Sequence, residues 1–158
     1  MSIFTVKPIG KVRSNENETL IEVEKSYLPA LQALDGFSHI NILWWFSDFD
    51  DEQYRSVLLS EQPYKNAPEI LGVFATRSPL RPNPIALTTV EVIHIDYEKG
   101  FIRIPFIDAN DNSPVLDIKP YTPSLDRVES PSVPAWCSHW PKSTEESASF
   151  VWEEVFNF

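Results

Sequence analysis

Cysteine and glycine are both scarce in this chain of 158 residues. The single cysteine, Cys137, cannot form a disulfide within the chain, and no second cysteine lies at metal-site spacing. The four glycines form neither a GxGxxG fingerprint nor a phosphate-binding loop. These absences exclude a disulfide-stabilised fold, and they disfavour a dinucleotide or nucleoside triphosphate site and the Rossmann fold.

Long apolar runs are missing as well. No stretch approaches the roughly 20 apolar residues of a membrane-spanning helix, and the N-terminus lacks the apolar run of a signal peptide. We therefore expect a cytoplasmic protein without a membrane partner. The three histidines are scattered and no HExxH or CxxC pattern occurs, so no metal is expected.

Basic residues are outnumbered, with 13 Lys and Arg against 23 Asp and Glu, which gives a formal net charge of -10. Nucleic-acid binding relies on clustered Lys and Arg, so this balance disfavours a broad nucleic-acid surface. Any contact with RNA is expected to be local. Two modest basic clusters are available, Lys7, Lys11 and Arg13 near the start of the chain and Arg77 and Arg81 in the middle.

Runs of β-branched and aromatic residues indicate a mainly β fold. Six runs have the composition of strands: 4–12, 19–23, 39–46, 69–76, 85–95 and 101–107. Short helices are expected at 26–34 and 52–60. A longer one is expected over 143–155, because Ser143 and Glu146 match a capping box and apolar residues follow with helical spacing. Many short strands without βαβ alternation predict one barrel domain over residues 1–158.

Proline is the one compositional bias, with 14 residues concentrated at 79–84 and 114–141. Because proline lacks an N–H and fixes its own backbone angle, both stretches are expected to be ordered loops rather than helices or central strands. A stiff loop loses little entropy on binding, so Arg77, Arg81 and Asn83 could be held ready for a polar ligand. Arginine pairs with carboxylate or phosphate, and asparagine matches an adenine edge. The alternative is a stiff hairpin loop whose arginines face water.

Three ordered motifs resemble those of the TsaA-like (TrmO) family. The family's Arg-Ser/Ala-Pro-x-Arg-Pro-Asn-Pro-Ile-Gly motif is matched by Arg77, Ser78, Pro79, Arg81, Pro82, Asn83, Pro84 and Ile85. Its Asp-Gly-Thr-Pro-Val-Leu-Asp-Ile-Lys-Pro-Tyr segment is matched by Pro114, Val115, Leu116, Asp117, Ile118, Lys119, Pro120 and Tyr121. A third motif is matched by Gly36, Phe37, Ser38 and His39. Together the matches run from about residue 8 to residue 126.

The resemblance implies a function and a set of site residues. Family members are dimeric enzymes with a YaeB-like closed β-barrel and a few short helices. They use S-adenosylmethionine to methylate the exocyclic amine of threonylcarbamoyl-adenosine next to the tRNA anticodon. The implied cofactor-binding residues are Arg77, Ser78, Arg81, Asn83, Pro84, Asp108, Asp117 and Tyr121. Lys119 or His39 could orient or deprotonate the acceptor nitrogen, although a lysine must first lose its charge to act as a base.

The chain departs from the family pattern at a few places. Ala86 stands where the family usually has glycine, and Asn112 and Ser113 replace a Gly-Thr turn, although asparagine tolerates a left-handed backbone. The Pro-Arg-Gln segment and the additional C-terminal domain of longer members are absent. Two alternatives therefore stay open: a methyltransferase acting on a small molecule, and a non-enzymatic S-adenosylmethionine-binding or interaction module.

The tryptophans receive separate interpretations. Trp44 and Trp45, with Phe46, are expected in a core or a subunit interface, because an aromatic-rich strand usually serves packing. Trp136 and Trp140 lie in the proline-rich stretch, and loops lie on the outside of proteins. They are therefore expected on a binding or dimer surface.

Overall fold

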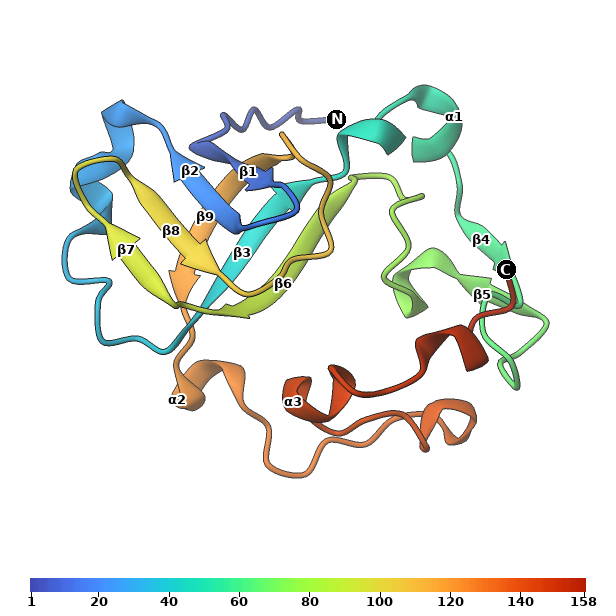
Figure 1. The fold of residues 1–158 in the computed structure, drawn as a ribbon. Helices are drawn as coiled ribbons and strands as arrows, with labels where there is room; N and C mark the ends of the chain where they lie inside the picture. Colours follow the sequence, from blue (N-terminus) through green and yellow to red (C-terminus); the bar gives the residue numbers. More distant parts are fainter. The chain divides into compact units, whose positions relative to one another are not determined.

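The computed structural model describes residues 1–158, which divide into two compact units (Figure 1). Unit 1 comprises residues 1–51 and 83–127, and unit 2 comprises residues 52–82 and 128–158. Each unit is thus assembled from two separate stretches of chain. None of the helices has the length and apolar character that a membrane span requires.

Unit 1 is a seven-stranded antiparallel sheet with short helical turns. Its strands are β1 (Gly10–Ser14), β2 (Thr19–Val23), β3 (His39–Trp45), β6 (Ile85–Glu91), β7 (His94–Asp96), β8 (Phe101–Ile104) and β9 (Pro114–Pro120). Their order is β6-β3-β9-β1-β2-β8-β7. The short helices are η1 (Lys25–Leu31), η2 (Ser47–Phe49) and α2 (Pro123–Asp126).

The core of unit 1 lies on one face of this sheet. Alternate residues of β3, namely Ile40, Ile42 and Trp44, are buried, as a period of two requires when one face of a strand packs inward. The other fully buried aliphatic side chains come from the neighbouring strands and are Val12, Ile21, Ile102, Ile104 and Val115. Each stabilises the fold by about 1.5–3 kcal/mol through burial of apolar surface. The expectation that Trp44 lies in a core is confirmed.

The two end strands of the sheet, β6 and β7, share no ladder of hydrogen bonds with each other. The prediction of a mainly β fold with a few short helices is therefore confirmed, whereas the closed barrel is not. The two strands follow one another in the chain, separated only by Val92 and Ile93. The N–H of Val92 donates to Ser38 O (2.8 Å) and that of Ile93 to Arg103 O (2.9 Å).

Unit 2 contains a two-stranded sheet and short helical turns. Its elements are α1 (Glu52–Arg55), β4 (Leu59–Glu61), β5 (Ile70–Gly72), η3 (Val73–Ala75), η4 (Ala135–Cys137), α3 (Thr144–Ser147) and η5 (Trp152–Glu154). So small a sheet buries little surface, and large aromatic rings make up for it. They form one contiguous group, here named the aromatic cluster, of Tyr64, Trp136, Trp140, Trp152 and Phe156.

The aromatic cluster shows what Trp136 and Trp140 pack against within the chain. Both rings are half-buried, and they lie edge to face with a centroid separation of 5.5 Å. Their packing partners belong to unit 2 itself. They belong to the packed interior of this unit. A segment with little regular secondary structure is stabilised when its aromatic rings pack against neighbouring apolar surface.

The expectation that the proline-rich stretch 114–141 contains no central strand is wrong. β9 lies between β3 and β1 in the sheet. Its prolines, Pro114 and Pro120, occupy its first and last positions, where a missing N–H costs least. The five residues between them can all donate to the ladder, so the proline content of the wider window was misleading.

The predicted helix over 143–155 is also wrong beyond its first turn. The cap is present, because Glu146 N–H donates to Ser143 Oγ (3.1 Å), but α3 ends at Ser147. The indole N–H of Trp152 donates to Ser147 O (3.3 Å), and its ring packs against Trp140. Tertiary packing of Trp152 therefore outweighs the helical periodicity of the sequence.

Other predicted elements are shorter than expected. The strand predicted at 4–12 begins only at Gly10, and those predicted at 69–76 and 101–107 end at Gly72 and Ile104. The run 85–95 is divided into β6 and β7, the helix at 26–34 is the 3-10 helix η1, and the helix at 52–60 ends at Arg55. Pro29 inside η1 and the pairing of Leu59 with Gly72 in the second sheet account for two of these differences.

Candidate functional site

The first predicted motif begins in a loop of unit 2, residues 76–82, here named the arginine loop. Thr76 is buried at its base, where its Oγ1 donates to Val73 O (2.8 Å) and accepts from Ser78 N–H (3.2 Å). Ser78 Oγ in turn accepts from Leu80 N–H (3.2 Å). Side-chain hydroxyls thus replace the backbone partners that a proline-rich loop lacks.

The two arginines of the arginine loop differ in orientation. Arg81 folds back on the loop and donates to three carbonyl oxygens, Thr76 O (3.3 Å), Ser78 O (3.2 Å) and Val73 O (3.4 Å). From α1, Arg55 Nε donates to Pro82 O (2.9 Å). Arg77 is exposed. Arg81 therefore braces the loop, and Arg77 is the more exposed of the two arginines.

The positive charge of the arginine loop affects the pKa of Tyr64. Burial raises the pKa of the Tyr64 phenol, and the Arg77 backbone N–H together with the charges of Arg77 and Arg81 lower that pKa by less. The phenol therefore stays neutral at physiological pH, with its hydroxyl group directed to this loop.

The remainder of the first motif belongs to unit 1 and begins β6. Pro84 is fully buried, and its carbonyl accepts from Phe46 N–H (2.9 Å) at the end of β3. Asn83 is exposed immediately before it. Ala86 is buried opposite Trp44, so the methyl group that replaces the family's glycine contributes to the core.

The second and third predicted motifs meet on one sheet face, here named the outer face. Asn41 of β3 pairs with Lys119 of β9, and Tyr121 N–H donates to His39 O (3.0 Å) just beyond the ladder. Leu43 pairs with Asp117, and the register then shifts between Leu43 and Trp44. Because alternate residues share a face, the side chains opposite the buried isoleucines of β3 include those of His39, Asn41, Asp117 and Lys119.

Lys119 and Asp117 form an ion pair on the outer face. Lys119 Nζ lies 2.8 Å from Asp117 Oδ2, and the two side chains are 63% and 48% exposed. The hydrogen bond to Asp117 and its charge raise the pKa of Lys119. Lys119 is therefore a cation in this structure, because the effect of Asp117 outweighs the desolvation that would lower its pKa and turn it into a base.

His39 begins β3 and is held by two neighbours. Its Nδ1 lies 2.8 Å from Ser38 Oγ, and its ring meets the Tyr121 ring at a centroid distance of 6.3 Å in an edge arrangement. Because Ser38 occupies Nδ1, Nε2 is the ring nitrogen that can meet a substrate. His39 and Tyr121, which are 82 positions apart in the sequence, thus form one group.

Asn41 is a polar residue of this face that the sequence motifs did not single out. It is only 8% exposed, and its Nδ2 donates to Asp126 Oδ1 (2.9 Å) while its Oδ1 accepts from Thr89 Oγ1 (2.7 Å). Asp126 Oδ2 also accepts from Thr122 N–H (2.8 Å). The network fixes the chain that follows Tyr121. The sequence did contain a signal for this residue, because Asn41 is an amide within the otherwise apolar strand INILWW.

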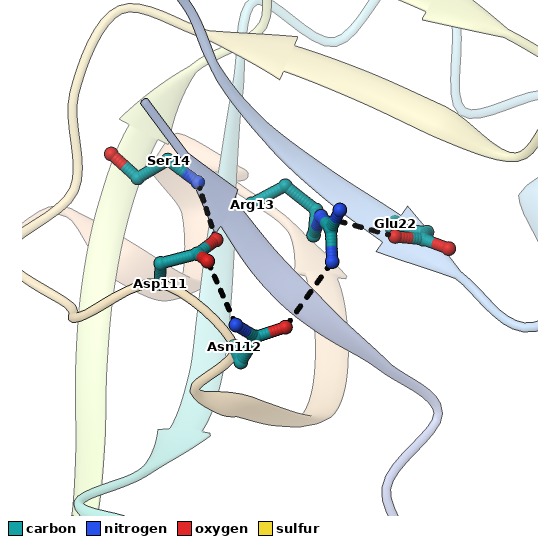
Figure 2. Close-up of polar contacts among 5 residues, drawn as sticks. All are labelled: Arg13, Ser14, Glu22, Asp111 and Asn112. Carbon is teal, nitrogen blue, oxygen red and sulfur yellow. Dashed lines mark hydrogen bonds and ion pairs between the residues drawn. The ribbon is translucent and has the colours of Figure 1, made fainter. Parts of the chain in front are cut away.

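Asp108 does not join this group. It is exposed in the loop between β8 and β9, which precedes Pro114, whereas Tyr121 follows the opposite end of β9. The next part of this loop contacts the end of β1 (Figure 2). Ser14 N–H donates to Asp111 Oδ1 (3.0 Å), and Arg13 Nη1 donates to Asn112 Oδ1 (3.2 Å). Asn112 has a φ of 67°, so the left-handed turn expected there is present.

A cleft of about 370 Å³ opens in unit 1 beside residues Asp117, Ile118 and Pro120 of β9. Its walls are mostly apolar and come from η1, the turn after it and β9, and they include Tyr27, Leu31, Leu34, Phe37, Asp117 and Ile118. Sites for small ligands have this size and character, with a few polar groups that fix orientation. No group of three or more His, Cys, Asp or Glu side chains is arranged to hold a metal ion.

Comparison with known proteins identifies relatives of this chain. It is 34% identical over 137 residues to an S-adenosyl-L-methionine-binding protein of Archaeoglobus fulgidus, covering 78% of this chain and 93% of the relative. It is 32% identical over 146 residues to the tRNA (adenine(37)-N6)-methyltransferase of Escherichia coli, covering 91% of this chain and 60% of that enzyme.

Solved structures and a family model agree with these relatives. The crystal structure of TrmO from Pseudomonas aeruginosa superposes with a TM-score of 0.65 at 29% identity, covering 85% of this chain and 62% of that one. The chain thus spans about three fifths of the length of that protein. The model of the tRNA-methyltransferase O N-terminal domain matches residues 5–127. The resemblance inferred from the three motifs is confirmed, and the chain belongs to the tRNA-methyltransferase O N-terminal domain family.

Proposed function

We propose that this chain binds S-adenosylmethionine and transfers its methyl group to the exocyclic amine of threonylcarbamoyl-adenosine next to the tRNA anticodon. The observation that carries the proposal is the family match over residues 5–127, which includes both the arginine loop and the outer face of β3 and β9. The Escherichia coli relative is named for methylation of adenine 37 of tRNA. The Archaeoglobus fulgidus relative is named for the cofactor.

The cofactor carries a carboxylate, an ammonium group and an adenine, and the proposed binding residues complement these groups. Asp117 suits the ammonium, and Asn83 and Tyr121 suit the base. Arg77 suits the carboxylate, because guanidinium pairs with it in two parallel hydrogen bonds. Ser78, Arg81 and Pro84 are proposed to hold the backbone around these groups. Asp108 is retained from the family resemblance alone.

When bound, the sulfonium group supplies an activated methyl group. The task of the protein is to align the acceptor nitrogen with that methyl and to remove the proton that the nitrogen loses, and alignment alone can account for several kcal/mol of the barrier. His39 is the better candidate for the proton, because Ser38 and Tyr121 orient its ring. Lys119 is better suited to hold Asp117 or to attract a negatively charged substrate.

Two substitutions distinguish these roles. Changing His39 to Ala is expected to lower the rate of methyl transfer by about 100-fold, the usual contribution of a general base. Changing Lys119 to Arg keeps the charge and the partner Asp117 but cannot yield a neutral amine, and the rate is expected to stay within about threefold of the natural protein. Incorporation of labelled methyl groups into threonylcarbamoyl-modified tRNA measures both.

The pH dependence provides a further control on the same assay. The pKa of Lys119 is raised, so this side chain keeps its charge at all pH values below that raised pKa. The rate should therefore not increase between about pH 7 and 9 through loss of a proton from Lys119. An inactive Lys119→Arg protein beside an active His39→Ala protein would reverse the two assignments.

The proposal as a whole is tested by ligand binding and by product formation. At a cofactor concentration 100 times its dissociation constant, the free energy of unfolding should increase by about 2.7 kcal/mol. Absence of a thermal shift would remove the cofactor from the proposal. A shift without methylated tRNA would leave cofactor binding and change the acceptor.

The net charge of -10 favours one second candidate, a small-molecule acceptor. Phosphate contacts make tRNA methylation strongly dependent on salt, whereas a small acceptor gives a reaction with little salt dependence. If tRNA failed to compete with the reaction and added salt did not slow it, the small-molecule assignment would be preferred. A non-enzymatic binding module would show the thermal shift with no methylated product at all.

We further propose that β6 and β7 act as one bent strand that completes a YaeB-like closed barrel, which the hydrogen bonds of Val92 and Ile93 to β3 and β8 neighbours support. A single functional domain over 1–158, a homodimer and a cytoplasmic location are proposed from the family resemblance. Light scattering of the purified protein at several concentrations tests the dimer, and limited proteolysis tests the single domain.

A further inference from the structure

The C-terminal segment 128–158 lies outside the residues that the family model matches, yet it is an integral part of unit 2. Its last residues are bound to the chain around Tyr64. The N–H of Lys65 donates to Val155 O (2.8 Å), and Asn157 donates from its N–H to Pro63 O and from Nδ2 to Gln62 O (both 3.1 Å). The segment therefore clamps residues 62–65 from outside the family domain.

Tyr64 is the residue that this clamp surrounds. Its ring stacks on Trp136 with a centroid distance of 5.7 Å and an interplanar angle of 12°. Trp140 meets it edge to face at 5.0 Å, and Phe156 lies at 5.9 Å on a tilted plane. All three partners come from the C-terminal segment. Three aromatic contacts leave the ring little rotational freedom.

The hydroxyl group of Tyr64 extends from the aromatic cluster to the arginine loop. The backbone N–H of Arg77 acts on this hydroxyl, and the guanidinium groups of Arg77 and Arg81 are near enough to change its pKa. One end of Tyr64 therefore belongs to the C-terminal clamp, and the other end lies at the residue where the family motif begins.

We propose that Tyr64 is a positioning residue, through which the C-terminal segment holds the arginine loop in the conformation that presents Arg77 to the cofactor. The ligand named here rests on the proposed function. Arg81 already braces the interior of the loop through three carbonyl oxygens. Tyr64 braces its start, at the amide of Arg77.

The physical advantage of such a brace is preorganisation. A loop that is already held in its binding conformation loses less entropy when the ligand arrives, so affinity increases without a new contact to the ligand. This chain has few glycines and a stiff proline run after Arg77, but Thr76 and Arg77 themselves precede the prolines. A bond from Tyr64 restrains that first part of the loop.

The test is a Tyr64→Phe substitution in the full chain, which removes the hydroxyl and keeps the ring in the aromatic cluster. We expect faster amide hydrogen exchange confined to residues 76–78 and an unchanged melting temperature. Calorimetry should show a dissociation constant for S-adenosylmethionine raised about three- to tenfold, the loss of one hydrogen bond. The KM for the cofactor should increase equally, with kcat unchanged.

Tyr97→Phe is the matched control, because Tyr97 lies in unit 1 and its hydroxyl donates to Asp35 Oδ1 (2.7 Å). It should leave both the exchange at 76–78 and the affinity unchanged. In addition, Trp136→Leu should speed exchange at the same amides, because it loosens the ring that Tyr64 stacks on.

The readouts separate this inference from the proposed function. Unchanged exchange at 76–78 in Tyr64→Phe would overturn the inference even if the cofactor binds. Faster exchange throughout unit 2 with a lower melting temperature would assign Tyr64 a structural role only and would also overturn it. A natural protein that fails to bind the cofactor, combined with exchange changes confined to 76–78, would retain the brace and refute the proposed function.

Discussion

Changing Arg77 to Ala is expected to raise the dissociation constant for S-adenosylmethionine by about 10- to 100-fold, as for the loss of charged hydrogen bonds to a carboxylate. Arg77 is the exposed guanidinium of the arginine loop, whereas Arg81 is occupied by three carbonyl oxygens. The loop itself should keep its conformation, because its hydroxyl and Arg81 braces do not involve the Arg77 side chain. Isothermal calorimetry on the full chain measures the change.

Two controls accompany this substitution. Arg77→Lys keeps the charge but loses the planar fork, so it should recover only part of the affinity. Arg103→Ala removes one positive charge from an exposed pair with Glu18 at 3.8 Å and should leave the affinity unchanged. Equal affinity of Arg77→Ala and the natural protein would remove Arg77 from the cofactor site and favour the view that this arginine simply faces water.

Changing Gly10 to Ala is expected to have the largest effect on stability. Gly10 is buried at the start of β1 and pairs with Val23 of β2. A Cβ at this position would overlap the carbonyl oxygen of Glu22 and lie 3.0 Å from Val23 Cα. These are backbone atoms in a ladder, so they cannot yield as a flexible side chain does. We expect a loss of about 3 kcal/mol in the free energy of unfolding, at the upper end for overpacking.

Gly72→Ala is the matched control for Gly10→Ala. Gly72 has φ of -68° and ψ of 142°, and a Cβ there would meet nothing within 4 Å. Alanine adopts this conformation without strain and reduces the entropy of the unfolded chain, so a gain of about 0.4–1 kcal/mol is expected. Urea unfolding of both proteins measures the pair. A Gly10→Ala protein as stable as Gly72→Ala would show that β1 and β2 can separate at low cost.

The predictions for Arg77 and Gly10 depend on residues at different separations in the sequence. The proposed importance of Arg77 follows from a motif of contiguous residues, which lies within the residues that the family model matches. The importance of Gly10 depends on how close β1 approaches β2, which no short pattern around Gly10 shows. The contrast between Arg77 and Arg81 likewise appears only once the backbone of the loop is in place.

The proline-rich stretch 114–141 could not be assigned correctly from its local composition. Residues 114–120 contain both a family motif and the strand β9. The sequence showed the motif, but its proline content predicted a loop instead of the strand. The two prolines mark the ends of β9, but composition over 114–141 averages them with prolines of later loops. The prediction of a helix over 143–155 is wrong for a related reason, because Trp152 packs against Trp140 instead of following helical spacing.

The outer face shows how far the site itself could be predicted. Asp117 and Lys119 stand two positions apart in a strand, so a β assignment would have placed them side by side. Their grouping with His39 and Asn41 depends on β3 pairing with β9 in one register. The position of Asp108 could not be predicted in this way. It is close in sequence to the second motif but lies at the opposite end of β9 from Tyr121.

By itself, the sequence determined the family, the mainly β character, the stiff arginine loop, the left-handed turn at Asn112 and the cap at Ser143. Each of these depends on the stereochemistry and hydrogen bonding of residues adjacent in the chain. Only the tertiary structure decided the strand order, the inward fold of Arg81, the charged state of Lys119 and the aromatic clamp on Tyr64. The strand order and the clamp depend on contacts between residues far apart in sequence, which form only when the chain packs. Arg81 and Lys119 contact near neighbours in the sequence, which the folded backbone brings within reach.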